Sequence, residues 1–194
     1  MFKAVLATQN KNKAKEIIQI LTEIEFLPRP SDFPDIEESG STIEENAILK
    51  AVTIAEHAKI PSLADDTGLE VEELNFTPGV HSARFAGEGS SDLDNVNKVL
   101  SLMENKSNRT AMFKTVIAMA FPDGKLIVGK GEVKGSLTSQ IRGTNGFGYD
   151  AIFIPQTGDG RTFGQMSSEE KNSMSHRKLA LIDFKSKFEQ FIKQ

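Results

Sequence analysis

A polar turn near the amino end, Thr8 to Lys13, separates an apolar segment from a helical pattern. Its six residues supply one hydroxyl, three side-chain amides and two lysines. Backbone N–H groups at a strand-to-helix turn attract anions, and a lysine in the first helical turn opposes the helix dipole. The turn therefore suggests a phosphate site that includes Lys13, although a solvated surface turn has the same composition. We expect Lys13 to be exposed and to contribute little to packing.

Two adjacent carboxylates, Asp65 and Asp66, follow an apolar segment in "SLADDTGLEV". We interpret this stretch as a strand, a polar break and a second strand. Neighbouring side chains of an extended segment point to opposite faces, so one carboxylate can face a binding site while the other faces the scaffold. A carboxylate at a strand end suits Mg²⁺, which prefers oxygen ligands. The chemistry of an Asx turn would also explain the pair.

A helix with a cation near its apolar side is predicted just before this stretch. Thr42 and Glu45 form a capping box that begins a helix reaching to about His57. Lys50 lies beside the apolar stripe of this helix, so its ammonium is expected near the core boundary, where a snorkelling lysine is the alternative. The acidic pair Glu37 and Glu38 precedes the helix and offers further oxygen ligands, or is only solvated.

The glycine-rich segment "GTNGFGYDAIF" suggests a place where a ligand approaches the backbone. Phe147 and Tyr149 lie between its glycines, and an exposed aromatic ring can stack on a nucleobase. A β-bulge or a barrel corner would explain the same glycines.

A cluster of three cations, Lys171, His176 and Arg177, lies near the start of the final helical pattern. Arginine is the fork-shaped donor that suits phosphates or base acceptors, although such a helix face is often only surface. We expect Ser167 and Glu170 to cap this helix, and we expect its apolar stripe to belong to the core. The stripe comprises Leu181, Phe184, Phe188 and Phe191.

The elements that must position these groups alternate between strand and helix in the first half of the chain. The pattern predicts strands over 2–7 and 25–27, a helix over 14–21, a proline-rich acidic loop over 28–41 and an irregular segment over 77–91. Ser91 is expected to cap a further helix, and a long β-meander follows from Arg109. This order predicts an α/β protein with a mixed, twisted sheet.

Composition excludes several classes of function. The 194 residues are 38% hydrophobic and 26% charged, which fits a globular chain with one core or two lobes. With no cysteine, disulfides and thiolate metal sites are excluded. We expect no membrane span and no secretory signal, and therefore a cytoplasmic protein. The net charge of -4 argues against non-specific electrostatic binding of nucleic acid, and no RNP-type motif supports RNA binding.

Six blocks taken together resemble the non-canonical purine nucleoside triphosphate pyrophosphatases, the inosine/xanthosine triphosphate pyrophosphatase family. The blocks appear in the family's order between Leu6 and Leu181, which is nearly the whole chain: "LATQNKNKAKEI", "EESGSTIEENAILKA", "ADDTGLEV", "PGVHSARFAG", "GFGYDAIF" and "EEKNSMSHRKLAL". The resemblance implies an elongated two-lobed α/β fold in one domain over 1–194. In that fold, helices flank a long mixed twisted sheet, and a nucleotide binds in a central cleft.

The same resemblance implies a homodimer that uses Mg²⁺ to hydrolyse ITP, dITP and XTP to the monophosphate and pyrophosphate. Asp66 would be the catalytic carboxylate and a metal ligand, with a second ligand at Glu37 or Glu38. Lys13 and Lys50 would act on the phosphates. The expected substrate contacts are Thr8, Gln9, Asn10, Lys11, Asn12, Lys13, Thr67, Phe147, Gly148, Tyr149, Asp150, Lys171, His176 and Arg177.

The departures from the family pattern are small, and none removes a proposed catalytic group. Thr67 stands where serine is common, Ala151 replaces a frequent proline, and His81 occupies a commonly aromatic position. Two rival functions stay open at this stage. One is a related nucleotide pyrophosphatase for modified pyrimidine nucleotides or dTTP, and the other is a nucleotide-binding module that does not hydrolyse.

Overall fold

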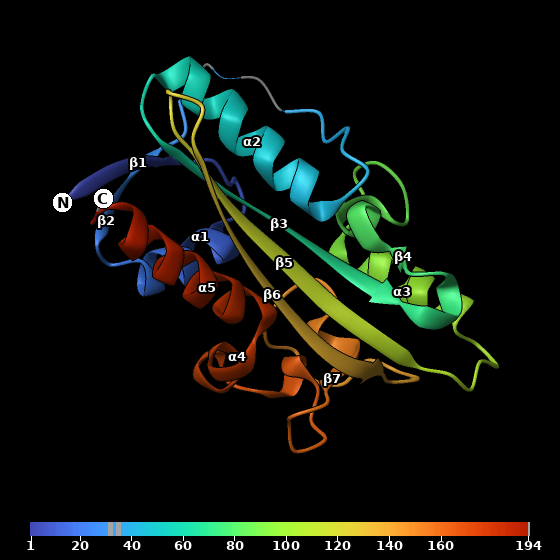
Figure 1. Ribbon diagram of the computed structural model, residues 1–194. Coiled ribbons are helices and arrows are strands. Elements are labelled where there is room, and N and C mark those ends of the chain that lie inside the picture. Colours follow the sequence, from blue (N-terminus) through green and yellow to red (C-terminus); the bar gives the residue numbers. More distant parts are fainter. Residues whose placement is uncertain (31–32, 34–35, 194) are drawn as a thin grey trace. The chain divides into compact units, whose positions relative to one another are not determined.

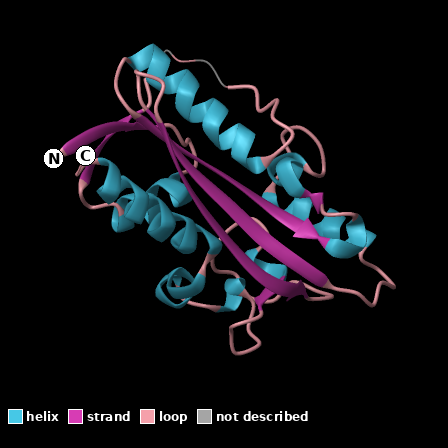
Figure 2. Ribbon diagram, in the orientation of Figure 1, coloured by secondary structure: helices cyan, strands magenta, loops and turns pink. Residues whose placement is uncertain are grey.

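The computed structural model describes residues 1–30, 33 and 36–193. Within them, seven strands form one sheet in the order β2-β1-β3-β5-β6-β7, and β4 pairs with β3 (Figure 2). The sheet is mixed, because β1 is parallel to its neighbours while β6 and β7 are antiparallel. The strands are β1 (Phe2–Leu6), β2 (Ile24–Pro28), β3 (Ser62–Val71), β4 (Thr77–Pro78), β5 (Thr110–Ala120), β6 (Leu126–Leu137) and β7 (Phe153–Pro155). The expected α/β class and mixed sheet are confirmed.

Helices flank this sheet, and the packing divides the chain into two units. The helices are α1 (Lys11–Ile20), α2 (Ile43–Ala58), α3 (Asp92–Leu102), α4 (Ser168–Met174) and α5 (His176–Phe191). Unit 1 comprises Met1–Asp66, Thr115–Gly131 and Arg177–Gln194, and unit 2 comprises Thr67–Lys114 and Glu132–His176. Strands β3, β5 and β6 contribute residues to both units. That the chain acts as one enzymatic domain stays a prediction.

The core of unit 1 lies where α1 and α5 pack against the strands. Ile17 of α1 and Phe184 and Phe188 of α5 belong to one buried cluster with residues of β1 and β3. The expected apolar stripe of the last helix is confirmed for Phe184 and Phe188, which are at most 1% exposed. Helix α2 buries Ala47 and Ile54 outside this cluster, and Figure 1 shows it on the opposite side of β1 from α5.

The core of unit 2 is rich in aromatic side chains. Phe113, Phe153 and Phe163 form neighbouring ring contacts with centroids 4.7 to 6.4 Å apart. Helix α3 adds Val96 and Val99 to the same cluster. Its amino end is capped by Ser91, as predicted. This core supports the loop that contains the glycine-rich segment.

The polar break predicted within "SLADDTGLEV" is wrong, because β3 is one continuous strand of ten residues. Asp65 and Asp66 lie in its middle and are 2% and 6% exposed. Aspartate is disfavoured inside strands, and a buried carboxylate is costly unless it is paired. Lysines from α1 and α2 supply that pairing, so the strand continues through both residues.

The single final helix predicted from Ser167 is also wrong. Ser167 and Glu170 do form the expected capping box, but the helix that they begin is α4, which ends at Met174. Ser175 is extended, with φ -74° and ψ 153°, and α5 begins at His176. No glycine or proline marks this break in the sequence. The expected helix over 43–57 and short strand near 25–27 are confirmed, while part of the expected loop over 28–41 lies outside the described residues.

Candidate active site

The turn before α1 is organised by Asn10, which is the N-cap of the helix. Its side-chain oxygen accepts hydrogen bonds from the backbone N–H groups of Asn12 and Lys13, at 3.0 and 3.2 Å. Asn10 N–H in turn donates to the hydroxyl of Thr8 at 3.3 Å. Two of the backbone N–H groups expected to attract an anion, those of Asn12 and Lys13, are therefore taken by the cap.

Lys13 is not the exposed surface residue that we expected. Its side chain is 18% exposed, and its ammonium lies 3.1 Å from Oδ2 of Asp65, whose side chain is fully buried. Burial alone would raise the pKa of Asp65. The positive charges of Lys13, Arg177 and Lys50 outweigh that effect and hold the pKa below its ordinary value. Lys13 is therefore part of a buried ion pair as well as a candidate phosphate ligand.

Arg177 belongs to the same buried group of charges. Its side chain is 1% exposed, and Nη1 lies 2.6 Å from Oε2 of Glu16, on α1. Its Nε lies 3.5 Å from Oδ2 of Asp65. The guanidinium is thus directed toward two carboxylates of unit 1. The expected contact of Arg177 with a nucleotide stays a prediction.

Lys50 brings together two carboxylates from separate segments of unit 1. Its ammonium lies 2.7 Å from Glu38 and 3.0 Å from Asp66. Burial disfavours the charge on Lys50, but Asp66, Glu38 and Asp65 outweigh it and raise the pKa of the lysine. Burial also raises the pKa of Asp66, and the attraction of Lys50 and Lys13 offsets only part of that effect.

The two adjacent aspartates therefore serve different partners, as the alternation of a strand predicts. Asp65 faces Lys13 and Arg177, while Asp66 faces Lys50. The buried Oδ2 of Asp66 has no hydrogen-bond partner among the described residues. A buried carboxylate oxygen without a donor is suited to a cation or to a water molecule.

The donor set fits a metal ion that is shared with a phosphate ligand. No group of three or more histidine, aspartate or glutamate side chains is placed to hold a metal within the described residues. Glu38 and Asp66 nevertheless both contact the ammonium of Lys50, so their carboxylates lie close together, whereas Glu37 is exposed. Mg²⁺ is commonly bound by one or two carboxylates together with substrate phosphates and water. The geometry therefore favours Glu38 over Glu37 as the partner of Asp66.

In unit 2, the loop over 146–150 is held by Asp150. The carboxylate of Asp150 accepts from the backbone N–H of Phe147 at 2.9 Å and from the ammonium of Lys171 at 2.5 Å. Lys171 also lies over the Phe147 ring, 4.5 Å from its centroid. Gly146 has φ +76°, and a Cβ built there would lie 2.1 Å from Asp150. A side chain at position 146 would therefore be strained at this φ and would displace the Asp150 carboxylate.

Two residues that the sequence did not indicate hold the rest of this loop. Asp92, at the start of α3, accepts from the backbone N–H of Gly148 at 2.7 Å. Ser82 accepts through its carbonyl from the Tyr149 hydroxyl at 2.8 Å. Tyr149 is 4% exposed, so its ring is a core residue and not the exposed base-stacking surface that we expected. Burial and the nearby charge of Asp92 raise the pKa of its hydroxyl.

The other predicted contacts differ in exposure. His176 is 3% exposed, and its ring stacks on Phe113 with centroids 4.5 Å apart. Thr67 is half-buried in β3, whereas Gln9 and Lys11 are exposed. His176 is thus held by packing within unit 2, and its role toward a ligand stays a prediction.

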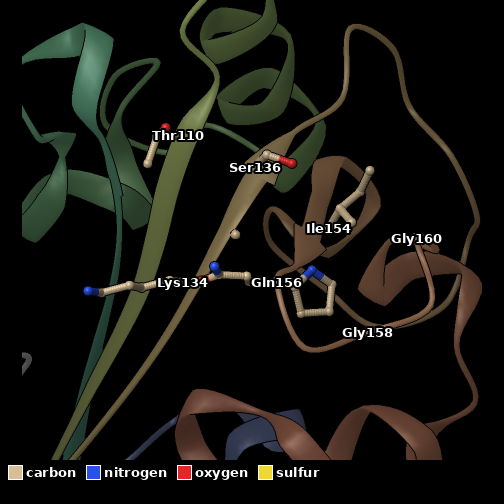
Figure 3. A pocket seen from close by; sticks show the side chains of 9 residues that line it. Thr110, Lys134, Ser136, Ile154, Gln156, Gly158 and Gly160 are labelled. Carbon is tan, nitrogen blue, oxygen red and sulfur yellow. The ribbon is translucent and has the colours of Figure 1, made fainter.

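A separate cavity of about 570 Å³ lies in unit 2, beside β6 and β7 (Figure 3). It is lined by Thr110, Lys134, Gly135, Ser136, Ile154, Pro155, Gln156, Gly158 and Gly160. No predicted site residue is among them, so the cavity is not part of the candidate site.

Comparison with known proteins places these residues in a family. The Ham1 family profile matches residues 4–187. The chain belongs to the Ham1 family. A relative from Desulfotalea psychrophila is 43% identical over 193 residues, covering 97% of this chain and 86% of the relative. One from Flavobacterium johnsoniae is 47% identical over 178 residues, covering 90% and 92%. Both relatives are named dITP/XTP pyrophosphatase.

Solved structures of the family share the fold. A HAM1 protein from Coxiella burnetii superposes with a TM-score of 0.91 at 40% identity, covering 98% of this chain and 100% of that chain. The Ham1 protein of Staphylococcus aureus gives 0.89 at 40% identity, covering 97% and 99%. Among the described residues, no helix is both long and apolar enough to cross a bilayer.

Proposed function

We infer that this protein hydrolyses non-canonical purine nucleoside triphosphates, namely ITP, dITP and XTP, to the monophosphate and pyrophosphate. Its relatives are named dITP/XTP pyrophosphatase. The observation that carries the proposal is the convergence of Glu38 and Asp66 on Lys50 in a chain of the Ham1 family. Two oxygen ligands and a cation at one point suit a magnesium–triphosphate complex.

The reaction requires water to attack the α-phosphorus and pyrophosphate to leave. Negative charge then builds on the departing oxygens, and Lys13 and Lys50 neutralise part of it. Asp66 and Glu38 would hold Mg²⁺, which withdraws charge from the phosphate oxygens when bound. Oδ2 of Asp66, which has no hydrogen-bond partner among the described residues, would accept a proton from a water molecule or orient it.

Selection of the base rests on the groups of unit 2. Hypoxanthine and xanthine carry a 6-oxo group where adenine carries a 6-amino group. A hydrogen-bond donor aimed at that oxygen is left unpaired by adenine, and such a site rejects adenine strongly. The loop over 146–150, in which Phe147 is half-buried, is the proposed nucleoside contact in unit 2, together with His176. Arg177, which belongs to unit 1, stays a predicted contact of the nucleoside or the phosphates. Guanine also has a 6-oxo group, so its rejection must depend on its 2-amino group.

The enzyme is further proposed to be a cytoplasmic homodimer that removes non-canonical nucleotides from the nucleotide pool. The alternative within the same chemistry is a pyrophosphatase for dTTP or modified pyrimidine nucleotides. The test is a substrate panel of ITP, XTP, dITP, GTP, ATP and dTTP with Mg²⁺, in which pyrophosphate and orthophosphate are scored separately. We expect pyrophosphate from ITP, dITP and XTP. Orthophosphate with a diphosphate product, or a preference for dTTP, would contradict the proposal.

A further inference from the structure

Four charged side chains of unit 1 form a continuous series of contacts. Lys13 contacts Asp65 at 3.1 Å, Arg177 lies 3.5 Å from the same Asp65 oxygen, and Arg177 lies 2.6 Å from Glu16. Both ends of the series, Lys13 and Glu16, are on α1 and three residues apart, so they share one face of the helix. Three of the four residues were predicted site residues or their neighbours, but nothing in the sequence indicated Glu16.

Burial makes these contacts depend on one another. The side chains of Asp65 and Arg177 are at most 1% exposed, and those of Glu16 and Lys13 are 13% and 18% exposed. A buried charge that loses its partner is costly, so the remaining groups must rearrange around it. Oδ2 of Asp65 lies near both Lys13 and Arg177, while Oδ1, its other buried oxygen, has no hydrogen-bond partner among the described residues.

We propose that Glu16 is a positioning residue for Lys13 and acts through Arg177 and Asp65. With Glu16 in place, Nη1 of Arg177 is engaged, and its Nε stays 3.5 Å from Asp65. Without the charge on Glu16, the guanidinium turns toward Asp65, because the two-pronged pairing of arginine with a carboxylate is its strongest. This closer pairing reorients the Asp65 carboxylate, whose Oδ1 has no hydrogen-bond partner among the described residues, and weakens its contact with the ammonium of Lys13. The inference rests on the proposed function, in which Lys13 binds the triphosphate.

The first test compares Glu16→Gln with a matched control, Glu23→Gln. Glu23 pairs with Lys185 of α5 at 3.0 Å, so it resembles Glu16 in linking an early segment to the same helix, but it does not touch the four-charge series. We expect Glu16→Gln to lower kcat/KM for dITP by roughly ten- to a hundred-fold, the range seen when a side chain that orients a functional group is removed. Glu23→Gln should match the wild type. Equal activities of both variants would overturn the inference.

The second test asks whether Glu16 acts through Lys13. If it does, Glu16→Gln has no further effect on kcat/KM in a Lys13→Ala background, because the group that it positions is already gone. A loss that is as large in this background as in the wild type would show an independent role and overturn the inference. A general loss of stability would also act in both backgrounds, so the cycle separates positioning from folding.

Binding of inorganic tripolyphosphate distinguishes failure of this inference from failure of the proposed function. The probe carries the phosphates without a base, and calorimetry measures its affinity with no turnover. If the wild type releases no pyrophosphate from dITP, the proposed function fails. Weaker tripolyphosphate binding by Glu16→Gln than by Glu23→Gln then still supports the positioning role. Equal affinities, or no binding by the wild type, would overturn it.

A further variant covers the case in which Glu16→Gln does not fold. Glu16→Asp keeps the charge and shortens the side chain by one methylene, so it weakens the contact with Arg177 without removing it. We expect a smaller loss of kcat/KM in the same direction. Wild-type kcat/KM in this variant would overturn the inference.

Discussion

The two units hold their candidate site residues by different physical means. In unit 1, the candidate groups are side-chain charges in buried ion pairs, such as Lys13 with Asp65 and Lys50 with Asp66. In unit 2, the candidate segment is a loop whose backbone N–H groups donate to Asp150 and Asp92, and Asp150 also pairs with the buried Lys171. Chemistry in unit 1 should therefore respond to a change of charge at constant shape. Binding by unit 2 should respond to a change of shape at constant charge.

The largest expected effect is that of Asp66→Asn, which should nearly abolish hydrolysis. The substitution keeps the shape and removes the charge that holds the metal or orients water. Because burial raises the pKa of Asp66, its charge disfavours the folded state, and the variant should be at least as stable as the wild type. The measurement is kcat over a Mg²⁺ titration together with denaturant unfolding. Near-normal kcat at low Mg²⁺ would refute the catalytic assignment.

Asp65→Asn is the matched control, and we expect it to lower the stability of the fold more than it lowers hydrolysis. The pKa of Asp65 is lowered by its cationic partners, so its charge stabilises the fold. Removing it leaves Lys13 and Arg177 without their shared carboxylate, at a cost of about 3–5 kcal/mol in the free energy of unfolding. Hydrolysis should suffer less than in Asp66→Asn wherever the variant is folded. Equal stability of the two variants would remove the distinction between the adjacent aspartates.

The two cores offer a second comparison. Phe184 of unit 1 and Phe163 of unit 2 are both fully buried. Replacement of either by alanine should lower the free energy of unfolding by about 3–5 kcal/mol. If the chain unfolds as one cooperative domain, both variants shift the same calorimetric transition. Two transitions, each shifted by only one variant, would contradict the prediction of a single domain.

Gly146→Ala tests the role of shape in unit 2. The added methyl group overlaps Asp150, and the backbone of the loop holds the alanine at a positive φ that it disfavours, so the loop must move. We expect KM for dITP to rise about ten-fold, equivalent to ~1.4 kcal/mol of binding, while affinity for inorganic tripolyphosphate stays unchanged. Gly160→Ala is the control, because it has φ +91° but no atom within 4 Å of the built Cβ. An equal rise in KM for both variants would assign the effect to general backbone strain.

Short sequence motifs predicted where helices begin, because the residues that cap a helix are neighbours in the chain. Thr42 with Glu45 and Ser167 with Glu170 begin helices as predicted, because each capping box is complete within four residues. The continuity of β3 was missed because the cations that compensate its aspartates come from other elements.

Distant contacts explain why the sequence did not indicate Glu16 and Asp92, which contact candidate site residues. Glu16 meets Arg177 across 161 positions of sequence, and Asp92 meets Gly148 across 56. Nothing in the sequence around Glu16, or around Asp92 in the first turn of α3, indicates these distant partners. The resemblance to a family supplied the candidate residues, but the residues that contact them and hold them in place could be identified only from the fold.

The smallest expected effect concerns an exposed ion pair in unit 2, which contrasts with the buried pairs of unit 1. Glu170 accepts from Arg161 at 2.6 and 3.2 Å and from the backbone N–H of Ser167 at 2.7 Å. The hydrogen bond from Arg161 and that from Ser167 lower the pKa of Glu170 to about 2. A lowered pKa means that the stabilisation is complete above the unfolded value, near 4.5, and is lost as the pH falls toward 2.

Glu170→Gln should therefore lower Tm slightly at pH 7, and the difference from the wild type should shrink between pH 4.5 and pH 2. Glu169→Gln is the control, because it removes the same charge from the same turn of α4 without touching the Arg161 pair. The difference for Glu170 should also shrink in high salt, since exposed charges are screened. The loss of stability in Asp65→Asn, where the carboxylate is buried, should persist under the same salt. Equal salt sensitivity of the two variants would show that burial does not determine how these two carboxylates respond to salt.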